Sequence, residues 1–332
     1  MKKEIFFLFF LWSSSLFAQV PGYSMSSPQS SSQALQSTGV TAATPDQALL
    51  GNPGFLSFQN SHNATFSYKY GNFPLLGSGY YHNRNGKNGF GFSLKPYSER
   101  FTDERQLSYV SSFFFTNRVT EKLAFSVGIG PSLAYRIPEY GSASLSPNIF
   151  LAFKSGSTQI GLGAESPGSF RFESYLGSDI LRERLPERIQ LGWKEEWGSK
   201  FFSNLEIQKV FWERAYFKRN DRENKVEGYN GTDGISVRFG LGLKITKEIS
   251  FLTGFGSQMV PNGNGSMWNL ARSWSLGVVG EILPSLVGNG IFGSVFYQRL
   301  YLDSLYRESQ AGFQLTKFLS SEEEEPRTPN SK

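Results

Sequence analysis

The chain has no cysteine among its 332 residues and only two histidines, His62 and His82. Without cysteine there can be no disulfide bond, no thiolate metal ligand and no lipid-modified cysteine that holds the protein on a membrane. Two histidines alone leave a transition-metal site short of its usual ligands. We therefore expect no metal and no cofactor, and any attachment to a membrane must come from the fold itself.

Long apolar runs and strong net charge are also missing. After residue 18, no segment approaches the roughly 18 uninterrupted apolar residues of a membrane-spanning helix, and the mean hydropathy is −0.32. The net charge of +5 is small for this length, and no basic stripe with interleaved aromatic residues indicates a nucleic-acid partner. A transmembrane β-barrel remains compatible with these values, because half of each barrel strand faces inward.

The N-terminus has the layout of an export signal. Lys2 and Lys3 precede an apolar core over residues 5–12, and a polar and small run then ends at Ala18. We interpret residues 1–18 as a cleavable signal peptide, so that the mature chain begins at Gln19. The alternative is an uncleaved anchor helix, but so short an apolar core cannot cross roughly 30 Å of hydrocarbon.

What the chain does contain is apolar residues at every second position in one short segment after another. The stretch 123–135 is the clearest case, with apolar odd positions and small or polar even positions. Such a period of two is typical of a strand whose two faces meet different solvents. The apolar face is continuous and the other is rich in glycine and serine, which favours a transmembrane barrel with lipid outside and water or ligand inside. The odd positions are Leu123, Phe125, Val127, Ile129, Pro131, Leu133 and Tyr135.

Aromatic residues make up 16% of the chain, as expected of a barrel with aromatic girdles at both membrane interfaces. Alternation predicts about fourteen antiparallel strands within a barrel domain over residues 63–319. An even count fits bacterial barrels with both ends in the periplasm. The strands are expected near 64–70, 76–83, 89–96, 106–115, 123–135, 149–153, 160–164, 189–193, 201–207, 235–243, 249–255, 274–282, 291–297 and 311–315.

The predicted connections alternate in length. Links after even-numbered strands are short, whereas the longest links, over 165–187, 212–233 and 258–270, follow odd-numbered strands. This is the pattern of periplasmic turns and outward-facing loops. Twelve or sixteen strands remain open, since strand ends read from one sequence err by several residues. A soluble sandwich or propeller would explain the strands but not their aromatic-rich outward face.

Charged residues are confined to the parity that we assign to the lumen. On the lipid face a charge would cost about 2 to 4 kcal/mol near the midplane. These residues either pair across the lumen or form a solute-selecting ring. Pro131 cannot donate a ladder hydrogen bond, so we expect a local kink there or a lateral opening toward lipid. The inward charged positions are Lys69, Arg136, Lys154, Arg188, Lys194, Glu206, Arg238, Lys244 and Glu281.

Residues 19–62 lack strand alternation and contain the turn signal Asn52-Pro53-Gly54, flanked by apolar residues such as Leu50 and Phe55. A disordered leader would not usually carry such an apolar cluster. We therefore expect part of this segment to fold inside the barrel as a plug.

This layout resembles the FadL-type hydrophobic-compound transporters of bacterial outer membranes, a family of fourteen-stranded barrels with an N-terminal hatch. The resemblance rests on the signal peptide, on the segments 39–43 and 48–56, and on the fourteen candidate strands. It implies that Asn52, Pro53, Gly54 and Phe55 belong to the hatch and that the lumen passes long-chain fatty acids or other hydrophobic molecules to a lateral opening. Gly54 departs from the Asn-Pro-Ala element common in that family, and the polar lumen and acidic tail are further departures.

These observations are compatible with three functions. In the first, a hydrophobic or amphipathic solute binds an aromatic group in the 165–187 link, formed by Phe170, Phe172, Tyr175 and Leu176. In the second, a structural or secretion-associated barrel docks a periplasmic protein through the acidic tail 320–332, which we expect to be disordered. In the third, the protein is an enzyme, but His82 lies beside an Asn-rich turn and is expected to be a solvated turn histidine. We expect a transporter and no enzymatic activity.

Overall fold

A computed structural model describes residues 35, 39–59, 61–70, 75–96, 106–136, 139–141, 143–166, 168–174, 180–184, 186–211, 214, 216–219, 222–225, 234–246, 249–261, 268–283, 291–301 and 307–320. The expected signal peptide and the tail beyond Ser320 lie outside these residues, so both remain predictions. No helix in the described ranges is long and apolar enough to cross a membrane.

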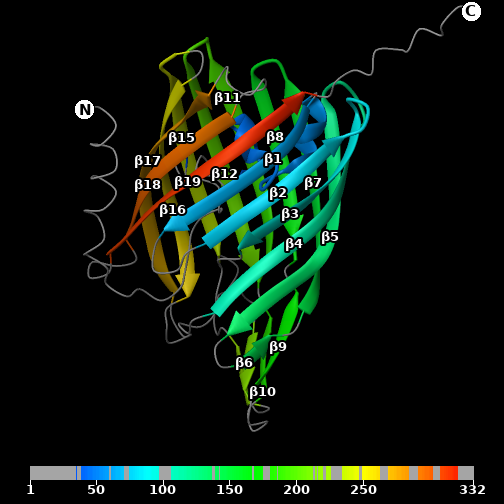
Figure 1. Cartoon of the computed structure of the whole chain (residues 1–332). Coiled ribbons are helices and arrows are strands. Elements are labelled where there is room, and N and C mark those ends of the chain that lie inside the picture. Colours follow the sequence, from blue (N-terminus) through cyan, green and yellow to red (C-terminus); the bar gives the residue numbers. More distant parts are fainter. Residues whose placement is uncertain are drawn as a thin grey trace, which may run out of the picture.

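The chain forms a closed antiparallel β-barrel of fourteen strands (Figure 1). The first strand, β1 (Ser61–Tyr70), pairs with β2 (Leu75–Asn83) on one side and with the last strand, β19 (Arg307–Ser320), on the other, which closes the cylinder. The prediction of about fourteen strands is confirmed. The other barrel strands are β3 (Asn88–Pro96), β4 (Gln106–Arg118), β5 (Leu123–Arg136), β7 (Ala143–Ser155), β8 (Thr158–Glu165), β11 (Glu187–Trp197), β12 (Phe201–Phe211), β15 (Ile235–Lys244), β16 (Ile249–Pro261), β17 (Trp268–Leu283) and β18 (Ile291–Tyr301).

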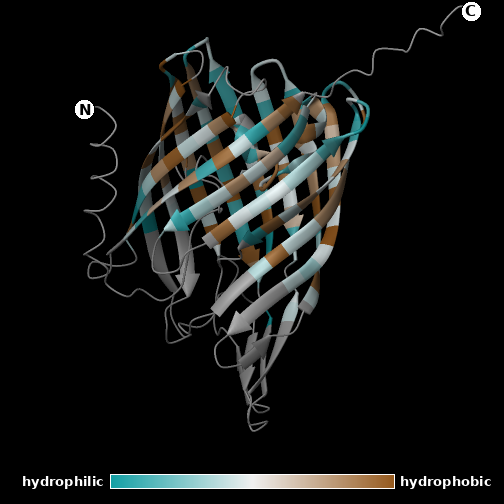
Figure 2. Ribbon diagram, viewed as in Figure 1, coloured by the Kyte–Doolittle hydropathy of each residue, from teal (hydrophilic) through white to brown (hydrophobic). Residues whose placement is uncertain are grey.

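The two faces of the wall follow the predicted alternation. In β5, Val127 and Ile129 are 48% and 53% exposed, whereas Ala124, Ser126 and Ser132 are fully buried. Figure 2 shows the same alternation of hydrophobic and hydrophilic residues along the strands around the barrel. An outer face of this kind is suited to lipid, because exposing so many large apolar side chains to water would be unfavourable.

The two ends of the barrel differ. We call the end that holds Ser61 and Ser320 the turn end, because the short turns after β2, β4, β7, β11 and β15 also lie there. Gly156 and Gly198 have φ angles of 57° and 67° in two of these turns, a conformation that favours glycine. At the opposite end, which we call the loop end, the longer connections emerge. The predicted alternation of short and long links is thus confirmed for the described strands.

Five short strands extend the wall at the loop end (Figure 1). They pair in the order β6, β9, β10, β13, β14. Four of them fall within the links 165–187 and 212–233, which the alternation pattern treated as loops, so that part of the prediction was wrong. These strands are short and highly charged, and no lipid-facing stripe marks them in the sequence. They are β6 (Glu139–Gly141), β9 (Ser169–Ser174), β10 (Ile180–Arg184), β13 (Tyr216–Arg219) and β14 (Arg222–Lys225).

The described part of the N-terminal segment, residues 35 and 39–59, lies inside the barrel near the turn end (Figure 1). It contains two 3-10 helices, η1 (Pro45–Gln47) and η2 (Pro53–Phe58). Leu49, Phe55 and Leu56 pack with Tyr81 and Phe114 of the wall in one apolar cluster. The predicted plug inside the lumen is therefore present in these residues.

Candidate functional site: the plug and the lumen

The side chain of Asn52 makes three hydrogen bonds that hold the plug in place. Its side-chain Oδ1 accepts a hydrogen bond from the backbone N–H of Gly54 at 3.0 Å, and so caps η2. Its Nδ2 donates to the carbonyl of Val40 within the plug at 3.0 Å and to the carbonyl of Leu151 in β7 at 2.8 Å. Pro53 occupies the first turn of η2, where its missing N–H costs nothing. One side chain thus joins two parts of the plug to the wall.

Close packing explains why residue 54 is glycine and not the alanine of the Asn-Pro-Ala pattern. A Cβ at this position would lie 3.0 Å from Asn52 Oδ1 and 3.1 Å from the Cβ of Ala152 in β7. Both contacts are tighter than ordinary packing, so an alanine would push the plug a few tenths of an ångström from the wall. Glycine here lets η2 lie directly against the wall.

Further hydrogen bonds attach the plug around the circumference. Thr41 Oγ1 donates to Asn204 Oδ1 of β12 at 2.7 Å. On the other side, Gln314 Nε2 of β19 donates to the carbonyl of Asp46 at 2.8 Å, and Asn83 Nδ2 of β2 donates to the carbonyl of Gln59 at 2.9 Å. Sequence reasoning missed these hydrogen-bonding amides, although their inward parity along the strands was available as a signal.

Inward glycines of the wall make room for the plug backbone. A Cβ on Gly161 of β8 would lie 1.8 Å from the carbonyl oxygen of Val40, and one on Gly240 of β15 would lie 2.7 Å from that of Leu35. Contacts this close are impossible for any other residue without moving the plug. The prediction of a glycine-rich inner face is confirmed at these two positions, and the plug accounts for them.

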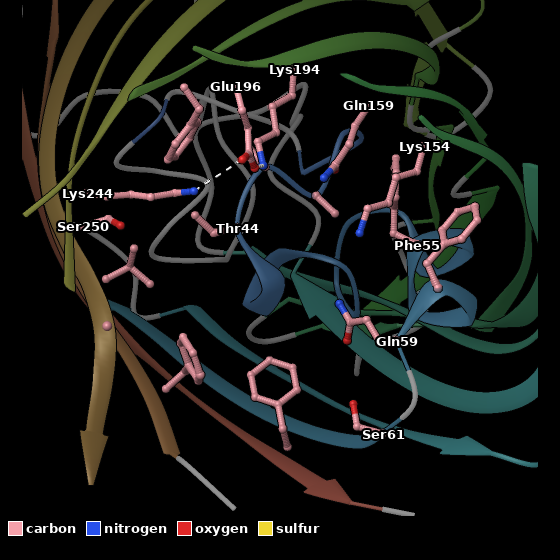
Figure 3. A pocket seen from close by; sticks show the side chains of 18 residues that line it. Thr44, Phe55, Gln59, Ser61, Lys154, Gln159, Lys194, Glu196, Lys244 and Ser250 are labelled. Atoms are coloured by element: carbon pink, nitrogen blue, oxygen red, sulfur yellow. Dashed lines mark hydrogen bonds and ion pairs between the residues drawn. The ribbon is translucent and has the colours of Figure 1, made fainter. Parts of the chain in front are cut away.

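Between the plug and the turn end lies a cavity of about 540 Å³, which we call the turn-end cavity (Figure 3). Residues 42–44, Phe55, Phe58 and Gln59 of the plug form part of its lining. The wall contributes aromatic and charged side chains. They include Phe202, Phe292 and Phe318 together with Lys154, Gln159, Lys194, Glu196 and Lys244.

The turn-end cavity carries three lysines and one glutamate, a net charge of +2 from three positive charges and one negative charge. Glu196 binds both Lys194, at 2.7 Å, and Lys244, at 3.4 Å. Lys194 Nζ also lies 5.1 Å from the centre of the Phe202 ring, close enough for a cation–π contact. The inward placement of Lys154, Lys194 and Lys244 is confirmed by their presence in this lining.

On the loop side of the plug, a charged bridge crosses the lumen. Glu165 of β8 pairs with Lys95 of β3 and, at 2.5 Å, with Arg188 of β11. Gln190 Nε2 adds a hydrogen bond to Glu165 at 3.2 Å. Because β4, β5 and β7 lie between β3 and β8, the Lys95–Glu165 pair spans the interior. This pair confirms the prediction that inward charges pair across the lumen. Of the three charged residues, the sequence analysis named only Arg188 as inward-facing.

The β4–β5 ladder is interrupted beside this bridge. Pairing ends at Val110 opposite Ser132 and resumes at Phe113 opposite Ile129. In the gap, Ser111 Oγ donates to the carbonyl of Pro131. A Cβ on Gly130 would lie 2.3 Å from the Ser111 carbonyl oxygen, so the backbone of β4 lies close against Gly130 here. The pairing register is the same on both sides of this gap, and β5 continues through Pro131. The lateral opening considered for Pro131 remains a prediction.

The structure describes only part of the predicted aromatic binding group. Phe170 and Phe172 alternate in β9 of the loop-end extension, opposite Glu183 and Leu181 of β10. Tyr175 and Leu176 lie outside the described residues, so this group remains a prediction.

His82 stacks on His62 at the turn end, with ring centroids 4.6 Å apart, and contacts Phe90 at 5.0 Å. His62 Nδ1 accepts a hydrogen bond from the backbone N–H of Asn83 at 3.0 Å. Among the described residues, no hydrogen bond joins His82 to a serine or a carboxylate.

No known family model matches this chain, and no curated protein matches it in sequence. Solved structures do match in fold. A Pseudomonas aeruginosa FadL homologue is 11% identical, with 90% of this chain and 99% of that chain covered and a TM-score of 0.67. The Pseudomonas putida toluene transporter TodX is 11% identical, with 91% and 100% covered and a TM-score of 0.63. The CymD monoaromatic hydrocarbon channel is 13% identical, with 90% and 98% covered and a TM-score of 0.62. The chain therefore has the fold of FadL-type barrels over nearly its whole described length.

Proposed function

We propose that the protein lies in a bacterial outer membrane and passes hydrophobic or amphipathic small molecules from the cell surface into the bilayer. One observation carries the proposal: a barrel with a lipid-compatible outer face contains a plug that is hydrogen-bonded to the wall on several sides. Barrels of the same fold have been named as hydrocarbon channels and as a FadL homologue. A transport role accounts for a lumen that is held closed by a fixed plug, and no enzymatic step is required.

The proposed route enters at the loop end and leaves through the wall above the plug. Passage straight through the lumen would require breaking the plug bonds made by Asn52, Thr41 and Gln59. The β4–β5 interruption instead offers a place where two strands lack ladder pairing, on the loop side of the plug. Ser112 and Asn148 border it from inside, with Asn148 Nδ2 donating to Ser112 Oγ at 2.8 Å. An aromatic group at Phe170 and Phe172 would serve as the first contact for the solute.

The test is to close the β4–β5 interruption by restoring a ladder donor with Pro131→Val. Pro147 of β7 is a matched control, since it is also an outward-facing proline, but it lies in the uninterrupted β5–β7 ladder opposite Ile129. Uptake of radiolabelled toluene and of a long-chain fatty acid would be measured in cells that express equal amounts of each variant. We expect P131V to reduce uptake of at least one solute about tenfold, a barrier increase of about 1.4 kcal/mol, while P147V is unaffected. Equal uptake by all three proteins would contradict the lateral route, and uptake no greater than in cells without the protein would contradict transport itself.

A further inference from the structure

The turn-end cavity holds an excess of positive charge in a partly enclosed space. Lys154 and Lys244 are close enough to Lys194 to repel its ammonium group. Glu196 is shared between Lys194 and Lys244, and among the described residues Lys154 forms no ion pair. Gathering three ammonium groups around one carboxylate is unfavourable unless a further anion completes the group.

The cavity also has a polar group without a partner. The side-chain Oε1 of Gln159, which lines the cavity together with Lys154, is buried and accepts no hydrogen bond. A primary amide can turn to present either its oxygen or its NH₂. Beside a carboxylate it would donate, so Gln159 and Lys154 together form a suitable place for such a group.

An acidic segment begins within a few residues of this cavity. Phe318 of β19 and Ser61 of β1 line the cavity, and β19 ends at Ser320. Four consecutive glutamates, Glu322 to Glu325, follow. An extended chain covers about 3.3 Å per residue, so the five residues after Ser320 reach about 16 Å, and the side chains add to this.

We propose that the acidic segment 321–326 folds back into the turn-end cavity and pairs its glutamates with Lys154, Lys194 and Lys244. Four adjacent carboxylates repel one another in solution, and the cavity supplies the opposite charge. A single exposed ion pair is weak, but a segment joined to the barrel has an effective concentration in the millimolar range or above. This inference does not depend on the transport proposal.

The first experiment measures how accessible each lysine is in the full-length protein in detergent micelles. A water-soluble acetylating reagent is applied for increasing times, and peptide mass spectrometry gives the rate at every lysine. The variant E322Q/E323Q/E324Q/E325Q removes the charges beyond the last strand and leaves the barrel sequence unchanged. We expect acetylation of Lys154 and Lys244 to be about threefold or more faster in this variant, and high salt to raise the wild-type rates similarly. Lys87, Lys122 and Lys200, exposed in turns at the same end, are the internal controls and keep their rates.

The second experiment identifies the contact by zero-length carbodiimide cross-linking. We expect cross-links within one chain from Glu322–Glu325 to the three cavity lysines, and their loss in K154Q/K194Q/K244Q but not in K87Q/K122Q/K200Q. Cross-links that favour the turn lysines, or that join two chains, would overturn the proposal. An added arm with laurate tests a free acid as occupant. The tail proposal is refuted if laurate slows acetylation of the cavity lysines while E322Q/E323Q/E324Q/E325Q is acetylated at wild-type rates. In that case the cavity binds a solute.

Discussion

Asn52→Ala is the sharpest perturbation of the plug, because one side chain makes three hydrogen bonds in a fully buried position. Alanine leaves the Gly54 N–H and the carbonyls of Val40 and Leu151 without these partners. A net value of about 1 kcal/mol per bond gives a loss of about 3 kcal/mol for local opening of the plug. Since 1.4 kcal/mol is about a factor of ten, the plug should open about a hundredfold more often.

Amide hydrogen exchange measures this opening directly. The N–H of Phe55 donates to the Asn52 carbonyl, and that of Gly51 donates to the Gln47 carbonyl, so both report on the plug. We expect their exchange in N52A to accelerate about a hundredfold, whereas amides in the centre of β15 keep their protection. Unchanged exchange at Phe55 would refute the role of Asn52. Equal acceleration in plug and wall would instead mean that the plug and the barrel open as one unit.

Two further predictions concern the wall. Gly161→Ala places a Cβ against the Val40 carbonyl oxygen and should destabilise the docked plug by about 2 kcal/mol. Chymotrypsin should therefore cleave within residues 39–59 faster in this variant. Cleavage at the wild-type rate would contradict the close packing. Glu165→Gln leaves Lys95 and Arg188 without their buried counter-charge and should cost about 3 to 5 kcal/mol of stability. Thermal unfolding should show a lower midpoint for this variant than for the triple variant Lys95→Met, Glu165→Leu and Arg188→Met, which removes all three charges. The reverse order would disprove the charged bridge.

The barrel wall was predictable because lipid and lumen impose opposite demands on successive residues. In β15 every outward position from Ile235 to Leu243 is apolar, and the inward positions are small or charged. That contrast disappears beyond the bilayer. In the loop-end extension, the register places Arg171 opposite Arg182 and Arg182 opposite Lys218. In β9 only Phe170 and Phe172 alternate as apolar residues, which is too short a run to mark a strand. Pairing there depends on neighbours that are distant in sequence.

The site was predictable in position but not in detail. Inward parity identified Lys154, Lys194 and Lys244, and the turn signal identified Asn52-Pro53-Gly54. Neither signal indicates which wall carbonyl Asn52 binds, because Leu151 lies 99 residues away along the chain. The Lys95–Glu165 pair likewise depends on barrel curvature, which brings two strands together across the lumen although they are not neighbours in the sheet.

The most direct test of the account is a spin-label scan along β15, made simple by the absence of cysteine from the native chain. Single cysteines would replace residues 236–241 in turn, and each labelled protein would be placed in lipid vesicles. The account predicts that labels at Val237, Phe239 and Leu241 are accessible to oxygen dissolved in lipid but not to a water-soluble nickel complex, and that labels at the even positions reverse this preference or are protected from both. An absence of two-residue periodicity, or a water-accessible label at Phe239, would contradict a barrel whose apolar face lies against lipid.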